Sequence, residues 1–415
     1  RTMALAGPVG MCALDEAWPS QLVECTDHIE CVALSLDGQL ACLGSAGGEI
    51  LVVDVDSGRV AARLDGHAGG TLALCATHDG RLVSGGEDSF VRLHSLEALG
   101  EVGRLRFECA AGIHCPTGTW VSAVAAHPSR SRIVAAAGRT AIVADLDGGA
   151  FGGDGNAPAG SVCVLGPLAR TIDCLAFLPD GTISSCGYGG VTLFRETCAG
   201  GAAEAAGADG APRYEAVARF AKTYHDGVDG ATLGYKGWLL SLAPAPTGDW
   251  LACGCSDNTV RLWRMANGQD FKCGGYSSKV SCVVWDSTGR YCATSGSNQA
   301  TLWDCSGRGP AGSAPLACVG QKAAVSAIAF HPAGRYFASG SIDGVIKVYD
   351  TCTFEVGDLR AGRPHVCHAL ASASVAAVMN GGGGGGSVEH LVWSTRGVLI
   401  AACALGRCTA LRCAV

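Results

Sequence analysis

Between Val325 and Asp350 the chain reads Val-Ser-Ala-Ile-Ala-Phe-His-Pro-Ala-Gly-Arg-Tyr-Phe-Ala-Ser-Gly-Ser-Ile-Asp-Gly-Val-Ile-Lys-Val-Tyr-Asp. An apolar strand is followed by a turn containing glycine and by a second strand of small residues. A polar turn then leads to a third strand that ends on an aromatic residue and Asp. Short apolar runs separated by turn residues are typical of antiparallel strands. This segment therefore predicts three consecutive strands of one sheet.

The same unit recurs along the chain. Clear copies begin at Trp238 and Val280, and the weaker copies begin near Ile29, Thr71, Trp120, Thr171 and Val388. The first-turn residues Gly248, Gly289 and Gly334 are 41 and 45 residues apart, which fits a four-stranded propeller blade of about 40–45 residues. Larger spacings coincide with Gly/Ala-rich inserts at 148–160, 199–212 and 380–386, which we expect to be flexible loops.

The clear copies resemble WD40 repeats, down to the terminal pairs Trp303-Asp304 and Tyr349-Asp350. Residues 190–194 and 275–279 are similar to a group of small bacterial WD40 proteins. The resemblance implies an all-β fold, a WD40-type β-propeller with blades ringed around a central channel. We prefer eight blades and keep seven as the alternative, because residues 364–386 are too irregular to place.

Both ends of the chain are expected to close the ring. We expect an irregular N-terminal segment at 1–20 and a single propeller over 21–415. After the last first strand, near 390–393, the chain has room for only two more strands. We therefore expect residues 21–25 to supply the outer strand of the last blade, which would remove an exposed sheet edge.

The composition excludes several classes of protein. The 415 residues are 48% hydrophobic and 16% charged, which excludes disorder of the whole chain. The net charge of −7 argues against a general binder of phosphate backbones, so no direct nucleic-acid partner is expected. No apolar run approaches the 18 residues of a membrane span, so we expect a soluble protein without a transmembrane segment.

The 23 cysteines are spread thinly, and many lie in apolar stretches, as Cys42 and Cys292 do. A disulfide scaffold would be short and would show clustered cysteines. We interpret these residues as buried thiols of a protein in a reducing compartment, the cytoplasm or an organelle interior, and not of a secreted one. The start, Arg1-Thr2-Met3, is compatible with a removed upstream segment and shows no signal-peptide pattern.

Catalytic signatures are missing from the sequence. It contains no Gly-x-Ser-x-Gly elbow, no His-Glu-x-x-His and no phosphate-binding Gly-x-x-x-x-Gly-Lys-Ser/Thr loop, so we expect neither an enzyme nor a cofactor. His365, Cys367 and His368 are candidate metal ligands, because zinc prefers imidazole and thiolate. On a strand, however, His368 would point away from the other two. No fourth ligand follows at a conventional spacing, and we assign no metal site.

In the WD40 family a Gly-His pair opens many repeats and bonds to an Asp in the turn before the third strand. Gly66-His67 is the one clean copy of that pair in this chain. Most blades are therefore expected to be held together by apolar packing without this network. We expect the first-strand residues Leu239, Leu242, Val283, Val325 and Ile328 to be buried between blades.

The resemblance implies a noncatalytic protein–protein interaction scaffold or an accessory subunit of a larger assembly, with protein partners. This step from fold to function is an analogy. The alternative is a metal- or redox-related accessory protein that uses its Cys and His residues.

In WD40 propellers the loops that join an outer strand to the next first strand share one face with the turns between second and third strands. In this acidic chain those loops carry tyrosines and lysines, which suits an interface with aromatic anchors and an acidic partner. The predicted partner-binding residues are Tyr188, Tyr235, Lys236, Asn258, Tyr276, Lys279, Asn298 and Lys322.

Overall fold

The computed structural model describes residues 14–16, 23–106, 120–147, 151, 162–197, 213–217, 231–311, 314–355, 357, 365–374 and 386–413. Most of the segment 1–20 and of the three predicted inserts lies outside these residues. The described part of the chain is built from strands and turns, with one 3₁₀ turn, η2 (Ala404–Gly406). No helix within it is long and apolar enough to cross a membrane.

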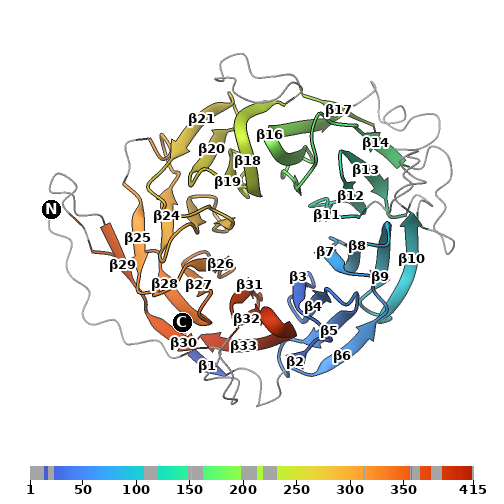
Figure 1. The fold of residues 1–415 in the computed structure, drawn as a ribbon, viewed down its shortest axis with the longest axis horizontal. Coiled ribbons are helices and arrows are strands. Elements are labelled where there is room, and N and C mark those ends of the chain that lie inside the picture. The colour runs from blue at the N-terminus through green and yellow to red at the C-terminus, as the bar shows by residue number, and fades with distance from the viewer. Residues whose placement is uncertain are drawn as a thin grey trace.

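The strands form a ring of small antiparallel sheets around a common axis (Figure 1). In most sheets the first strand lies nearest the axis and the last lies at the rim. The pairing divides the described strands into eight such sheets, two of which are joined by pairing between the long strands β16 and β18. We number these sheets as blades 1 to 8 in chain order.

Blades 1 to 3 have four strands each. Blade 1 consists of β3 (Ile29–Leu34), β4 (Leu40–Ser45), β5 (Ile50–Asp54) and β6 (Val60–Leu64). Blade 2 consists of β7 (Thr71–Ala76), β8 (Arg81–Gly86), β9 (Phe90–Ser95) and β10 (Gly100–Arg106). Blade 3 consists of β11 (Ala123–Ala126), β12 (Arg132–Ala137), β13 (Thr140–Asp145) and β14 (Val162–Leu165).

Blades 4 to 6 include two of the three clear sequence copies, those of blades 5 and 6. Blade 4 consists of β15 (Cys174–Phe177), β16 (Ile183–Glu196), which supplies two blade strands, and β17 (Tyr214–Ala216). Blade 5 consists of β18 (Leu233–Pro244), β19 (Trp250–Cys255), β20 (Val260–Arg264) and β21 (Gln269–Cys273). Blade 6 consists of β22 (Val283–Trp285), β23 (Tyr291–Thr294), β24 (Ala300–Asp304), β25 (Leu316–Val319) and β29 (His365–His368).

Blades 7 and 8 complete the ring. Blade 7 consists of β26 (Val325–Phe330), β27 (Tyr336–Ser341), β28 (Val345–Asp350) and β30 (Ala371–Ser374). Blade 8 consists of β31 (Val388–Trp393), β32 (Val398–Cys403) and β33 (Arg407–Cys413), with β1 (Leu14–Glu16) and β2 (Val23–Glu24).

The turn between the first and second strands of a blade is set by local backbone chemistry. Gly248, Gly289 and Gly334 have φ values of 77°, 70° and 79°. Residues with a Cβ rarely adopt this left-handed conformation, so glycine is favoured at the position. The regular spacing of these glycines in the sequence therefore marks real chain reversals.

The apolar first-strand residues pack between neighbouring blades. Leu239, Val283, Val325 and Ile328 are buried, and Val325 and Ile328 belong to the cluster that joins blades 6 and 7. Leu242 differs from the expectation, because it is half-buried and packs only at the edge of the cluster between blades 4 and 5.

The N-terminal segment pairs with the last blade. Val23 of β2 lies opposite Cys408 of β33, within the segment 21–25 that was expected to supply this strand. Leu14 of β1 also lies opposite Cys413 at the far end of β33. The segment 1–20, expected to be irregular, thus contributes one strand, because β33 is longer than β2 and leaves part of its edge free for pairing.

Strand β29 lies in a place that the repeat does not predict. It follows β28 of blade 7 in the sequence but pairs in parallel with β25 of blade 6, before the chain returns to blade 7 as β30. This crossing explains why the sequence near 364–386 could not be assigned to a regular blade.

Candidate functional site

Two kinds of loop meet at one end of the ring, which we call the upper face. They are the loops that precede each first strand and the turns between second and third strands. The His67 amide donates to the Gly48 carbonyl at 2.8 Å, and the Ser256 amide donates to the Trp238 carbonyl at 3.0 Å. The predicted partner-binding residues lie on these loops, and only some of them reach the surface.

Tyr276 points into its blade. Its hydroxyl accepts a hydrogen bond from Trp303 Nε1 at 2.7 Å and lies 2.6 Å from Thr294 Oγ1. Burial raises the pKa of this hydroxyl, so it stays protonated. The interpretation of Tyr276 as a partner contact is therefore corrected, because its polar group is committed to the interior.

Tyr235 is also buried, with 4% of its surface exposed. Its ring packs in the cluster between blades 4 and 5, and the Arg261 guanidinium lies 5.1 Å from the ring centroid. A side chain in this position cannot serve as an exposed aromatic anchor, and the expectation for Tyr235 is corrected in the same way.

The Gly66-His67 pair shows which hydrogen bonds the residue after the glycine makes in the loop before a first strand. The His67 Nδ1 atom lies 2.6 Å from a carboxylate oxygen of Asp88, and its Nε2 atom lies 2.9 Å from Ser84 Oγ. Ser84 Oγ is also 3.0 Å from Nε2 of His94, whose pKa is lowered to about 4 by burial. The result is a buried chain of hydrogen bonds within blade 2.

Other residues take the place of histidine in blades 6 and 7. Tyr276 bonds to Thr294 and Trp303 of blade 6, and Gln321 Nε2 donates to Ser339 Oγ at 3.0 Å in blade 7. These two blades therefore have polar networks of a kind that the search for a Gly-His pair did not predict. Fully satisfied buried networks of this kind help to specify one packing arrangement.

The sequence does contain a signal for these positions. In each case a glycine lies five residues before a buried residue of the first strand or of the loop leading into it, at Thr71, Leu239, Val280 and Val325. The pairs are Gly66-His67, Gly234-Tyr235, Gly275-Tyr276 and Gly320-Gln321. A search for histidine alone misses this spacing, because tyrosine and glutamine also reach the second strand.

The remaining predicted residues are more accessible. Lys236, Lys279 and Lys322 are exposed, and within the described part of the chain none of the three forms an ion pair. Asn298 is exposed, and Asn258 is half-buried in a turn with a φ of 59°. These residues are distributed over blades 5 to 7 and do not form one compact cluster.

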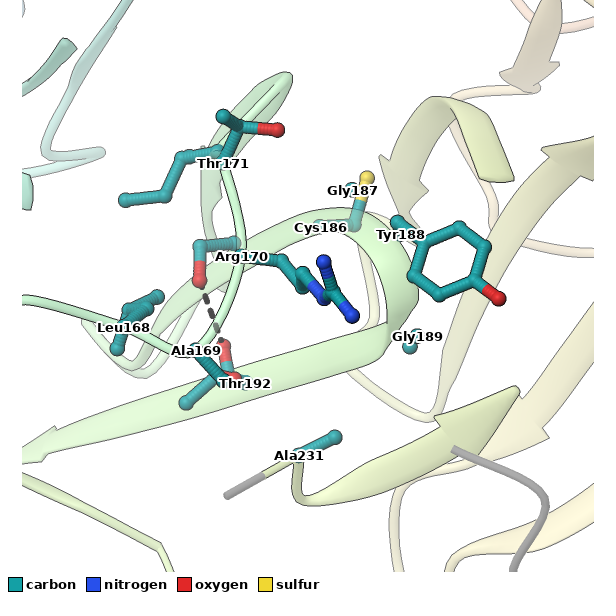
Figure 2. Close-up of a pocket in the computed structure, with 13 residues that line it drawn as sticks. Leu168, Ala169, Arg170, Thr171, Cys186, Gly187, Tyr188, Gly189, Thr192 and Ala231 are labelled. Carbon is teal, nitrogen blue, oxygen red and sulfur yellow. Dashed lines mark hydrogen bonds between the residues drawn. The ribbon is translucent and has the colours of Figure 1, made fainter. Parts of the chain in front are cut away.

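Tyr188 belongs to a group of three side chains in contact, Arg170, Tyr188 and Trp238, which we call the ladder and which the sequence did not predict. The Arg170 guanidinium lies 5.4 Å from the centroid of the Tyr188 ring (Figure 2). The Tyr188 ring also meets Trp238 edge-on, with centroids 5.3 Å apart. The three side chains come from the loop before β15, the turn within β16 and strand β18, so only the folded ring brings them together.

Glycines around Tyr188 allow this turn to lie against the loop before β15. A Cβ at position 187 would lie 2.3 Å from the carbonyl oxygen of Thr171, too close for any other residue. Gly190 has a φ of 129°, and a Cβ there would lie 2.2 Å from the Leu233 carbonyl oxygen. The close approach of the backbones fixes the position of Tyr188.

A small pocket lies between this turn and the loop before β15. Its volume is about 50 Å³, whereas sites for drug-sized ligands are about 300–1,000 Å³. Cys186 lines it. Hydrogen bonding with Cys174 lowers the pKa of the Cys186 thiol, but hydrogen bonding with Cys253 and burial outweigh this and leave that pKa well above its usual value. A protonated thiol is a poor nucleophile. This pocket therefore offers water-sized space and no activated group.

The candidate metal ligands of β29 are not brought together. The Cys367 thiol points inward and lies 3.4 Å from the Asp350 carbonyl oxygen. His365 Nδ1 accepts from the Gly357 amide at 3.0 Å, and His368 Nε2 lies 3.5 Å from a Glu355 carboxylate oxygen. Across the described residues, no group of three or more His, Cys, Asp or Glu side chains could hold a metal ion. The metal or redox alternative has no support there.

Charge is divided across the upper face. The loops and turns of blades 4 to 7 present four exposed cations and three exposed acids, namely Arg170, Lys236, Lys279 and Lys322 beside Asp173, Asp257 and Asp343. The loops and strand starts of blades 8 and 1 carry the acidic residues Glu389, Asp27, Glu30 and Glu49. An acidic partner would be attracted to the first sector and repelled by the second.

Comparison with protein families gives a match to the family described as "WD domain, G-beta repeat". The matched residues are 58–95, 229–264, 269–304 and 314–350. They fall in blades 1, 2 and 5 to 7, and three of the four segments coincide with the copies that are clearest in the sequence.

Curated relatives match over part of the chain. A protein named "Ribosome biogenesis protein WDR12 homolog" from Drosophila persimilis is 28% identical over 116 residues, 27% of this chain and 28% of that protein. Its namesake from Drosophila erecta is 30% identical over 107 residues, 25% of this chain and 26% of that protein. The chain thus spans little more than a quarter of the relatives it matches.

Solved structures share the fold over nearly the whole chain. The C-terminal WD40 domain of Sif2 superposes with a TM-score of 0.67 at 14% identity, covering 98% of this chain and 99% of that one. The computationally designed Ika8 protein superposes with a TM-score of 0.62 at 19% identity, covering 96% and 99%. At these identities the similarity concerns the fold alone.

Proposed function

The chain is a WD40-repeat protein, and we propose that it is a noncatalytic scaffold or accessory subunit that binds protein partners through the upper face of blades 4 to 7. Exposed Trp238 and three lysines without ion pairs in the described part of the chain are the observation that carries this proposal. A rigid ring holds such side chains in fixed positions at little entropic cost on binding.

A noncatalytic role is supported by the chemistry of the upper face. The pocket beside Tyr188 is too small for a drug-sized substrate, and the Cys186 thiol in it is held protonated. Aromatic and cationic side chains on a firm surface are instead typical of the energetic centres of protein interfaces.

The matched relatives are named for ribosome biogenesis, and this supports membership of a larger assembly inside the cell. We propose the same kind of role and an intracellular location for this chain. If ribosome-assembly proteins were recovered together with this chain, that result would support a role in ribosome biogenesis for this chain as well.

The test is affinity purification with mass spectrometry on the triple variant Lys236→Glu, Lys279→Glu and Lys322→Glu. We expect the partners recovered with the parent chain to be lost or strongly reduced, because three attractive charges become repulsive. The matched control carries Arg59→Glu, Arg195→Glu and Arg308→Glu, which change the net charge equally at exposed positions away from the upper face. Equal partner recovery from both folded variants would exclude this face as the main binding site.

A further inference from the structure

The upper face contains an arginine that the fold leaves available. Arg170 is exposed on the loop before β15, and its guanidinium lies over the Tyr188 ring. Within the described residues it forms no ion pair and no hydrogen bond. The neighbouring Arg139 differs, because its Nε donates to the Leu168 carbonyl at 2.6 Å and so fixes the loop. One arginine thus has a structural role and the other is free to bind.

Apolar surface adjoins this arginine through the ladder. Trp238, at the far end of the ladder, is 47% exposed, and Leu240 is 37% exposed. The pairing of β18 with β19 has a bulge between Leu239 and Ser241, where Leu240 is the extra residue. Bulges re-aim side chains, and this one turns Leu240 away from the buried sheet. A cation and an exposed tryptophan therefore both contact Tyr188, and exposed Leu240 follows two residues after that tryptophan.

We propose that the ladder of Arg170, Tyr188 and Trp238 binds an acidic peptide segment of a protein partner. A carboxylate of the segment pairs with the Arg170 guanidinium, whose planar fork matches carboxylate geometry. An apolar side chain of the same segment covers Trp238 and Leu240. This inference rests on the proposed function and names the chemistry of the partner.

The geometry sets the spacing of the two recognised side chains. The successive separations along the ladder are 5.4 Å from Arg170 to Tyr188 and 5.3 Å from Tyr188 to Trp238. An extended peptide rises about 3.3 Å per residue, so the carboxylate and the apolar residue are at most about three positions apart.

Charge on the surrounding loops favours the same class of partner. Lys236 and Lys279 are exposed on the adjoining loops of blades 5 and 6. Asp173 lies three residues after Arg170 and is exposed, and within the described residues it forms no ion pair with the Arg170 guanidinium. A basic segment would meet three cations at this place and is disfavoured.

The experiment is selection of a random dodecapeptide display library on the full chain, followed by fluorescence polarisation with synthetic copies of the enriched peptides. We expect enrichment of Asp or Glu at most about three positions from an aromatic or aliphatic residue. Arg170→Ala and Trp238→Ala should each weaken binding by about tenfold or more, and Arg308→Ala should leave it unchanged. Circular dichroism would verify that all three variants keep the fold.

Several outcomes would overturn the inference. These are the absence of any enriched peptide, enrichment of basic or uncharged peptides, and full binding by the Arg170→Ala variant. Tighter binding only when phosphoserine replaces the acidic residue would show that the site takes phosphorylated segments instead. If cellular partners are lost with the lysine variant but kept with Arg170→Ala, the proposed function stands and this inference alone fails.

Discussion

Replacing Tyr276 with phenylalanine removes one hydroxyl from the network of blade 6 and keeps the ring in place. The hydroxyl accepts from Trp303 Nε1 at 2.7 Å, so the variant leaves a buried indole N–H without its acceptor. Thr294 loses less, because its hydroxyl also lies 3.2 Å from the Thr301 carbonyl oxygen. One unsatisfied buried donor costs about 1–3 kcal/mol, and we expect Tyr276→Phe to lower the free energy of unfolding by that amount.

The assay is urea denaturation of the parent, Tyr276→Phe, Trp303→Phe and the double variant. If the two side chains act through their hydrogen bond, the double variant loses less stability than the sum of the single variants. Tyr291→Phe is the matched control, since Tyr291 is half-buried in the same blade and its hydroxyl has no hydrogen-bond partner in the described part of the chain. Additive single effects, or equal losses from Tyr276→Phe and Tyr291→Phe, would refute the network.

Three further outcomes are expected. Truncating buried Ile328 to Ala should cost about 2–5 kcal/mol in urea denaturation, and a much smaller loss would contradict its place between blades 6 and 7. Deleting residues 1–28 should lower the melting temperature and promote self-association, because the deletion uncovers the edge of β33. A deletion variant that stays monomeric and keeps the melting temperature of the parent would contradict ring closure by the N-terminal segment. Burial opposes ionisation of Asp88, but the hydrogen bonds from His67, Arg92 and the Ala68 amide, together with the charge of His67, outweigh it and hold the pKa of that carboxyl well below its usual value. The Asp88 carboxylate contributes fully to stability above the unfolded-state pKa of about 4, and this contribution is lost as the pH falls below that value. Asp88→Asn should therefore weaken the acid dependence of the free energy of unfolding, measured by urea denaturation at pH 2 to 7.

Local sequence was sufficient to predict the repeated strands and their first turns. Glycines at positions such as 248, 289 and 334 adopt positive φ values, and the apolar runs beside them are buried first strands. These properties depend on the conformational range of single residues and on the alternation of side chains along a strand. Both are present in the sequence before any long-range contact forms.

The direction of individual side chains was decided by the tertiary structure. Tyr235 and Tyr276 look like surface anchors in the sequence, but the ring places both beside the second strand of their own blades. The position of β29 beside β25 was equally hidden, because a strand of four residues carries no information about which blade edge it will join.

By itself the sequence determined that the chain forms consecutive short strands with tight turns, because those features follow from residue type and spacing. Only the tertiary structure decided that Arg170, Tyr188 and Trp238 form one surface. The three residues belong to two blades and to loops far apart in the chain, so their contact exists only after the blades have packed. Packing between blades buries the apolar strands. It also decides which loop side chains lie together at the upper face, and local sequence patterns do not contain that information.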